Sequence, residues 1–214
     1  MAEAAETGAN SELLGLAVCR LSLNPVRGRV RHPHQVGIAI RTAMFAELAL
    51  AGRLVGRQWP EAIGESDTGS RLLDAVHSAV AGRGPTRWRR WFNHVDADLA
   101  AATDALVESG RWRLEGKRII DCDPASTVVD QQTIRSYLNQ PEPPPDLTSA
   151  ILTLLVGGCG GVGRPTPRRT RKLARQWLPP HLLTSGRSGD AVLYSILWST
   201  YAIRRANPFP LLYR

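Results

Sequence analysis

Apolar residues recur at helical spacing along most of the chain, and glycines and prolines separate the segments. In residues 35–51, Val36, Ile40, Met44 and Leu48 follow one another at intervals of four, which predicts a helix with one apolar face. Gly52 stands where a left-handed residue commonly ends a helix. Similar spacing predicts further helices over 71–81, 85–109, 129–138, 147–156, 167–178 and 190–205. Residues 13–23 fit either a strand or a short helix.

Two segments depart from this spacing. The stretch RWRLEGKRIIDC (111–122) alternates around Glu115 and Gly116, which predicts a short β-hairpin. The stretch NQPEPPPD (139–146) holds four prolines and is expected to be a stiff connector. We therefore predict a mainly α fold: a single helical domain over residues 12–206 with a small β-hairpin, a disordered tail at 1–11 and a C-terminal tail at 207–214. Residues 191–203 are apolar nearly all round and too short to span a bilayer, so they are expected in the domain centre.

One carboxylate interrupts the apolar pattern of the 35–51 helix. Glu47 follows Met44 by three residues and therefore falls on or near the buried side. A buried carboxylate needs a partner. We predict that Glu47 is at least half buried and pairs with a basic group or a capping amide.

The charge is positive and unevenly distributed. The chain carries +8, and all but two of its 27 basic residues are arginine. Residues 164–214 hold ten Lys or Arg against one acid, Asp190. Such a basic end indicates an anionic partner, which is nucleic acid, an anionic membrane surface or a phosphorylated ligand. The alternative is a compositional bias toward arginine that serves only solubility.

Catalytic and cofactor motifs are missing from the sequence. The three cysteines are widely spaced, and the five histidines lack metal-ligand spacing. The run GCGGVG (158–163) matches a dinucleotide-binding pattern, but Pro165 and Pro167 follow it where a helix should begin, so it is expected to be a helix exit. We expect no enzyme activity, no cofactor and no metal. The acidic, small-residue start MAEAAETGANSE is not typical of a signal peptide, which favours a cytoplasmic protein that is peripheral at the membrane if it meets one.

Two basic segments leave alternatives open. The run RWRRW (87–91) suits stacking on bases or a lipid headgroup interface, or else its tryptophans pack inward. The predicted hairpin follows a helix, as the wing of a winged-helix protein does, and carries Arg111, Arg113, Lys117 and Arg118. A nucleic-acid-binding regulator is therefore one alternative, and a scaffold with incidental charge is another.

The stretch RTAMFAELALAGRL (41–54) resembles the signature helix of the Golgi phosphoprotein 3 family, whose pattern is close to L-x-x-E-L-A-L-x-G-R-I. The segments TGSRLLDAVHSAV and ATDALVESGRWRLEGKRII are similar to later family segments and follow in the same order, and the resemblance covers about residues 13–205. It implies a mainly helical single domain. The family's eukaryotic members are peripheral membrane adaptors that bind phosphatidylinositol 4-phosphate.

The resemblance also implies a lipid site. The family pocket uses a tryptophan, an arginine nine residues later and an Arg-x-x-Arg on the long helix. Here Arg41 matches the single arginine, His32 stands in place of the tryptophan, and Asp96 and Leu99 replace the Arg-x-x-Arg.

We therefore predict a degenerate lipid pocket that binds anionic membrane lipid with little headgroup selectivity. The anion site is expected around Arg41, with help from Arg31, His32, Arg89 and Arg90. A basic surface patch is expected at Arg168, Arg169, Lys172 and Arg175.

Overall fold

The computed structural model describes residues 12–92, 96–164, 166–178, 192, 195–197 and 199–203. The helices are α1 (Leu14–Leu21), α2 (Pro33–Leu50), α3 (Arg71–Arg83), α4 (Trp88–Trp91), α5 (Asp96–Glu108), α6 (Pro124–Asn139), α7 (Leu147–Cys159) and α8 (Pro167–Trp177). The strands are β1 (Leu23–Asn24), β2 (Arg29–Val30), β3 (Leu54–Val55), β4 (Glu61–Ala62), β5 (Trp112–Glu115) and β6 (Arg118–Asp121). The predicted mainly α fold with a small hairpin is confirmed.

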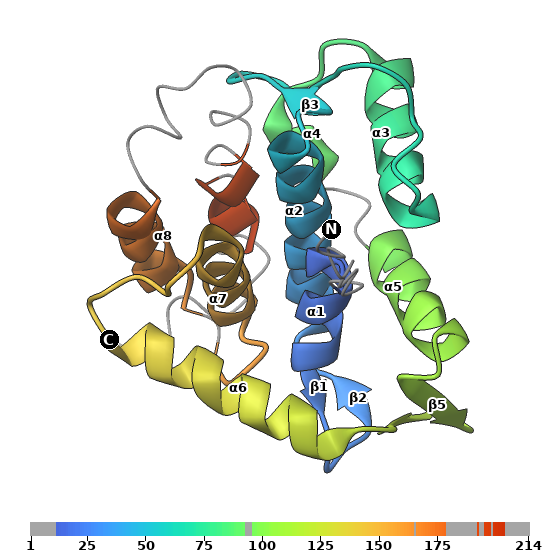
Figure 1. Cartoon of the computed structure of the whole chain (residues 1–214), viewed down its shortest axis with the longest axis vertical. Coiled ribbons are helices and arrows are strands. Elements are labelled where there is room, and N and C mark those ends of the chain that lie inside the picture. Colours follow the sequence, from blue (N-terminus) through green and yellow to red (C-terminus); the bar gives the residue numbers. More distant parts are fainter. Residues whose placement is uncertain are drawn as a thin grey trace, which may run out of the picture.

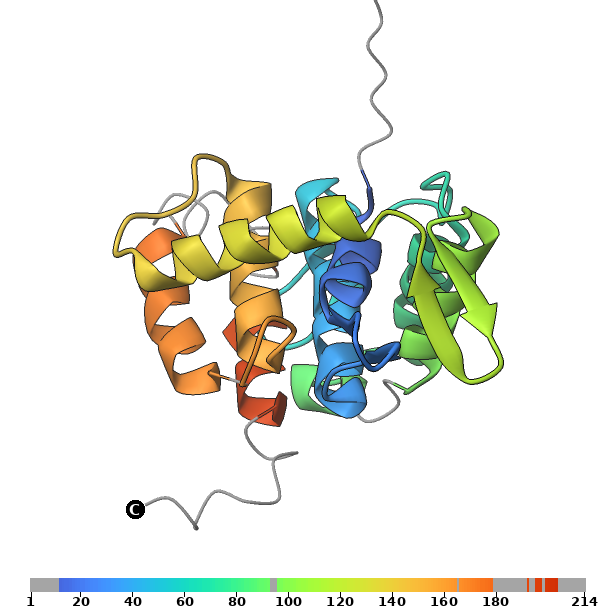
Figure 2. The same cartoon turned by 90° about the horizontal axis from the view of Figure 1, so that it is seen from below.

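Helix α2 lies in the middle of the molecule, and the other helices surround it (Figure 1). It packs against α1, α3, α5 and α7, while α8 packs on the far side of α7. Viewed from below, α6 runs across one end of the molecule (Figure 2). An arrangement of this kind requires a helix that is apolar on all sides, and twelve residues of α2 are buried, spread over its whole circumference.

The predicted apolar face of α2 is confirmed. Val36, Ile40, Met44 and Leu48 are all at most 2% exposed. The helix begins at Pro33, two residues earlier than predicted, because a proline at the first helical position loses no hydrogen bond. Of residues 13–23, which fitted either a strand or a short helix, Leu14–Leu21 form the helix α1, which packs along α2.

The single long helix predicted for 85–109 is wrong. The chain forms one turn, α4, and then a separate helix, α5. Phe45 of α2 explains the break, because its ring meets the rings of Trp88, Trp91 and Phe92 edge to face, with centroids 5.3, 5.9 and 6.3 Å away. Trp88 and Trp91 are buried, so the inward-packing interpretation of RWRRW is confirmed. Val95, which falls within the helix predicted for 85–109, lies outside the described residues.

Helix α3 also differs from its predicted end. It continues past Gly82 to Arg83, and Gly84 follows it with a φ of +66°. A positive φ at Gly84 fits a glycine without strain.

The predicted hairpin is confirmed as β5 and β6, which pair antiparallel from Trp112 with Asp121 to Glu115 with Arg118. Two more antiparallel pairs, β1 with β2 and β3 with β4, were not predicted. Each of those strands has two residues, which is too short for alternation to be read from sequence.

The C-terminal segments agree with prediction where they are described. In the 191–203 segment, Val192, Ser195, Ile196, Ser199 and Ile203 are buried in the helical core. Nowhere in the described part of the chain does a helix combine the length and hydrophobicity needed to cross a bilayer. The tails at 1–11 and 207–214 lie outside the described residues.

The glycine-rich run after α7 is a helix exit, as expected. Helix α7 continues through Cys159, and Gly160 closes it with a left-handed φ of +82°. A Cβ on Gly161 would lie 2.5 Å from the Ser22 hydroxyl, so this position brings the loop close to the start of β1.

The prediction for Glu47 is confirmed. Its side chain is mostly buried, and its Oε1 accepts the backbone N–H of Leu14 at 2.8 Å, in the first turn of α1. Its Oε2 is buried without a hydrogen bond. Burial raises the pKa of Glu47 from 4.5 to about 7, although the amides of Leu14 and Gly15 lower it in part.

We expect Glu47→Gln to stabilise the protein at pH 8. Because the Glu47 pKa is higher in the folded chain, the folded state binds this proton more tightly than the unfolded state between pH 4.5 and 7. Glu47 therefore lowers the free energy of unfolding as pH rises through that window, and the full cost is present above pH 7. Glutamine keeps the acceptor for Leu14 without the charge. Urea unfolding at pH 8 should show a gain of about 1–3 kcal/mol, and at pH 4.5 the gain should vanish.

Glu65→Gln is the control, because Glu65 is exposed in a loop. A Glu47→Gln effect that is the same at both pH values would show that the carboxylate does not carry the raised pKa.

Candidate functional site

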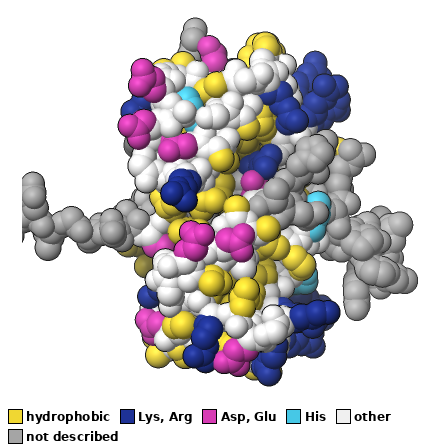
Figure 3. All heavy atoms as spheres, turned by 90° about the vertical axis from the view of Figure 1, so that its right-hand side faces the viewer, with side chains coloured by type: hydrophobic (Ala, Val, Ile, Leu, Met, Phe, Trp, Pro, Cys, Tyr) yellow, Lys and Arg dark blue, Asp and Glu magenta, His cyan; other side chains and the backbone are white. Residues whose placement is uncertain are grey.

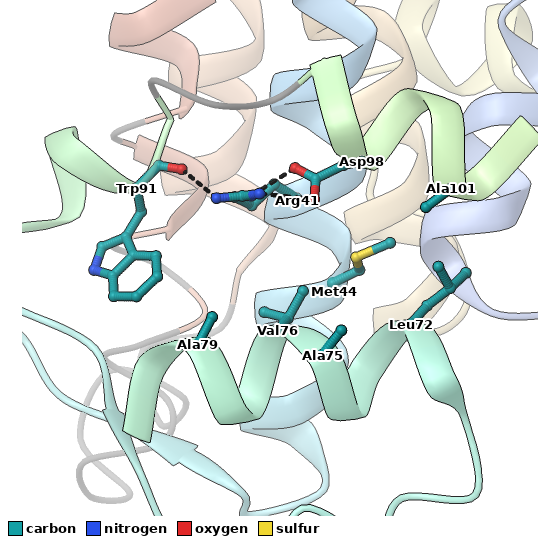
Figure 4. A pocket seen from close by; sticks show the side chains of 9 residues that line it. All are labelled: Arg41, Met44, Leu72, Ala75, Val76, Ala79, Trp91, Asp98 and Ala101. Carbon is teal, nitrogen blue, oxygen red and sulfur yellow. Dashed lines mark hydrogen bonds and ion pairs between the residues drawn. The ribbon is translucent and has the colours of Figure 1, made fainter. Parts of the chain in front are cut away.

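A small pocket lies beside α2, between α3 and α5. The cavity measures about 140 Å³, and its lining is mostly small and apolar (Figure 4). The residues that line it are Arg41, Met44, Leu72, Ala75, Val76, Ala79, Trp91, Asp98 and Ala101. Alanines on α3 and α5 leave the space, because larger side chains at 75, 79 and 101 would close it.

Arg41 and Asp98 form a two-pronged ion pair at one side of this pocket (Figure 4). Arg41 Nε donates to Asp98 Oδ2, and Nη2 donates to Oδ1 at 2.7 Å. Arg41 Nη1 donates to the carbonyl of Trp91 at 3.0 Å. The two side chains are only 14% and 10% exposed, so water screens the pair little.

Asp98 is subject to two opposing effects, burial and the charge of Arg41. Burial raises the pKa of Asp98, although the Arg41 guanidinium acts in the opposite direction. The pair is nevertheless held in the geometry in which a guanidinium and a carboxylate bind most strongly. An anionic ligand at Arg41 would have to displace Asp98 from the same nitrogen atoms.

A wider hollow of about 520 Å³ continues from the pocket past Trp91. The guanidinium of Arg83 lies over the Trp91 ring, 5.2 Å from its centroid, and Trp91 Nε1 donates to the carbonyl of Thr86 at 3.1 Å. Seen from the side of α3 and α5, hydrophobic side chains lie across the middle of the molecule, and groups of Lys and Arg lie at the upper right and the lower right (Figure 3).

Helix α8 presents a basic face on the other side of the molecule. Its apolar face, with Leu173, Ala174 and Trp177, is buried. Its exposed face consists of basic side chains and Gln176, and no acid occurs in this fully described helix. The exposed basic residues are Arg168, Arg169, Arg171, Lys172 and Arg175.

Two observations on the described residues concern metal binding and buried thiols. No three His, Cys, Asp or Glu side chains come together there in a way that would hold a metal ion. Burial raises the thiol pKa of Cys19 to about 12 and that of Cys159 to about 11, so neither is a reactive thiolate near neutral pH.

The sequence model of Golgi phosphoprotein 3 (GPP34) matches residues 17–188, which is most of the chain. The chain belongs to the Golgi phosphoprotein 3 family. No curated protein matches the sequence at a significant level.

The residues predicted for the anion site lie near two parts of α2. Arg41 lies in the pocket beside α4, where Arg89 and Arg90 are exposed. Arg31 and His32 lie before the first turn of α2, about 14 Å from Arg41 along the helix axis. Arg41, Arg89 and Arg90 thus lie near α4, and Arg31 and His32 lie at the start of α2. One anion site that uses all of them stays a prediction.

Sequence reasoning missed Asp98. The resemblance drew attention to Asp96 and Leu99, where the family has arginines, and the acid between them was not considered. One signal was available, because an arginine and an aspartate that both fall in largely apolar helices each need a partner. Arg171, the fifth exposed base of α8, was also not named.

We expect Arg41 and Asp98 to be strongly coupled in stability. Removing one partner leaves the other as an unpaired, mostly buried charge, so Arg41→Gln or Asp98→Asn should each cost about 2–4 kcal/mol. The double variant should cost at least about 1 kcal/mol less than the sum. Urea unfolding of all four proteins measures this difference.

The pair Arg113 and Glu115 is a matched control, since it also lies at 2.7 Å but its side chains are 66% and 56% exposed. Its coupling should stay below about 0.5 kcal/mol. Equal, small couplings for both pairs would mean that Asp98 does not hold Arg41 in solution and that Arg41 is open to ligands.

Proposed function

We propose that this protein binds anionic membrane surfaces peripherally, through the basic face of α8, with little selectivity among headgroups. The observation that carries the proposal is that α8 turns five basic side chains outward, with no acid among them, while its apolar face is held in the core. Each basic residue near an anionic surface contributes about 1 kcal/mol of attraction. Because α8 is anchored by Leu173 and Trp177, the five charges stay on one side.

We expect low headgroup selectivity because Arg41 is already engaged by other groups of the protein. A phosphate gains most from several free guanidinium groups at one place. Here the Arg41 guanidinium is engaged by Asp98 and by the Trp91 carbonyl, and the positions that carry arginines elsewhere in the family hold Asp96 and Leu99. The phosphatidylinositol 4-phosphate binding that the family resemblance implies is therefore expected to be weak here.

The alternative nucleic-acid function has less support from the charges around the hairpin. The helix before the hairpin, α5, exposes Asp104 and Glu108 and contains no basic residue, so it would repel a phosphate backbone. In the hairpin region, Arg113 pairs with Glu115 and Arg111 with Asp123.

We expect Arg168→Gln/Arg169→Gln/Lys172→Gln to weaken binding to vesicles of phosphatidylglycerol mixed with phosphatidylcholine. The loss of three surface charges corresponds to about 3 kcal/mol, or roughly a hundredfold in partitioning at low salt. Binding of the unaltered protein should also fall as salt is raised, because screening acts over about 8 Å at physiological ionic strength. Vesicle co-sedimentation over a salt series measures both effects.

The control is Arg87→Gln/Arg89→Gln/Arg90→Gln, which removes the same charge from exposed positions around α4. It should reduce partitioning far less. Equal losses in both variants would show that net charge, and not α8, drives binding. Absence of binding to anionic vesicles, together with a gel shift of DNA at the same salt, would favour the nucleic-acid alternative.

A further inference from the structure

A pocket remains between α3 and α5 because these two helices hardly touch each other. Both pack against α2, so the small pocket described above stays open between them. Its α3 wall consists of Leu72, Ala75, Val76 and Ala79 (Figure 4). Ala75 and Ala79 are exposed. A ligand can therefore enter from solvent without the movement of a helix.

The pocket is suited to a compact apolar group. Its volume of about 140 Å³ is close to the roughly 150 Å³ of an engineered cavity in another protein that takes up benzene. The two charged residues that line it, Arg41 and Asp98, are bound to each other, and Trp91 Nε1 donates to the Thr86 carbonyl. A sugar or another polar group placed there would lose hydrogen bonds to water without replacement. The pocket thus favours one ring or a short branched alkyl group.

The adjoining hollow has the opposite chemistry, since its lining includes two arginines and no acid. The residues that line it are Arg41, Ser78, Ala79, Gly82, Arg83 and Trp91. Arg41, Ala79 and Trp91 line both spaces, so the pocket opens into the hollow, while Asp98 lines the pocket alone. A ligand that fills both spaces has its apolar end between α3 and α5 and its polar end beside the last turn of α3.

Arg83 supplies the uncompensated positive charge of the hollow. Its guanidinium lies over the ring of Trp91, 5.2 Å from the centroid, and the ring is held in place because Trp91 is buried. No ion pair within the described part of the chain involves Arg83. Arg41, by contrast, is neutralised by Asp98. The net charge of the two spaces is therefore that of one guanidinium, which matches a monoanion better than a phosphate dianion.

We propose that the pocket and the hollow together bind a small carboxylate whose apolar body is one ring or a short branched alkyl group. The body lies in the pocket against Val76 and Ala101, and the carboxylate accepts hydrogen bonds from the Arg83 guanidinium, whose planar fork matches its oxygens. The Ser78 hydroxyl, which also lines the hollow, is a second donor. Arg83 follows Ala79 by one turn, about 6 Å along α3, so a short alkyl linker joins the two ends. This site goes beyond membrane adsorption through α8 and does not depend on it.

Phenylpropionate is the probe, because a short linker joins its ring to its carboxylate. Isothermal titration calorimetry without lipid should show that the protein binds it, whereas acetate, which lacks the ring, should give no heat of binding at the same concentration. Phenylpropionamide, which lacks the charge, should bind roughly tenfold more weakly, as expected for the loss of one charge-assisted hydrogen bond. Arg83→Gln should weaken phenylpropionate binding by the same factor. Arg71→Gln, exposed on the same helix but outside both spaces, should leave the affinity unchanged.

Filling the pocket tests where the ring lies. Ala75→Leu and Ala79→Leu each place a larger side chain in the pocket from an exposed helix position. Each variant should therefore keep the fold, as judged by its melting temperature, and lose phenylpropionate binding. Ala81→Leu is the control, because it adds the same side chain to α3 at an exposed position outside the pocket, and it should keep the affinity.

The proposal is overturned if phenylpropionate binds no better than acetate, if the amide binds equally well, or if the affinity survives both leucine substitutions in the pocket. Arg168→Gln/Arg169→Gln removes charge from α8 and should leave phenylpropionate binding intact. Loss of binding in that variant would show attraction by net charge and would also overturn the site. Since no lipid is present, the measurement stands even if α8 does not bind membranes.

Discussion

The burial of most of α2 is the constraint on which the rest of the structure depends. A charged side chain on the buried part of such a helix needs a partner in the protein, because little water reaches it. Two of its side chains need such compensation. Glu47 accepts the first amide of α1, and Arg41 binds Asp98 of α5. Each interaction fixes a neighbouring helix against α2, so the polar residues of the central helix also orient the helices around it.

This constraint distinguishes Arg41 from the exposed arginines of the chain. Arg41 is the residue that the family resemblance singles out, yet its position in the core requires a permanent counter-charge. Exposed arginines have no such requirement. The five bases of α8 are exposed, while the pocket of Arg41 and Asp98 presents mainly small apolar side chains.

The sequence predicted what depends on local periodicity. The apolar face of α2, the β5–β6 hairpin and the outward bases of α8 follow from spacing along one segment, and all agree with the structure. What it missed depends on contacts between distant segments. The break between α4 and α5 is set by Phe45, about 45 positions away, and the partner of Arg41 lies 57 positions further along the chain. The two-residue strands are too short to leave a pattern.

The pairing of Arg41 with Asp98 also limits how this sequence can change over time. A substitution at either position alone leaves the other residue as an unpaired charge at a mostly buried position. An uncharged pair would suit the same space, but the path to it passes through an unstable intermediate. We therefore expect substitutions at the two positions to occur together. Once the pair is present, a return to an unpaired arginine at position 41 requires the loss of Asp98, which is itself destabilising.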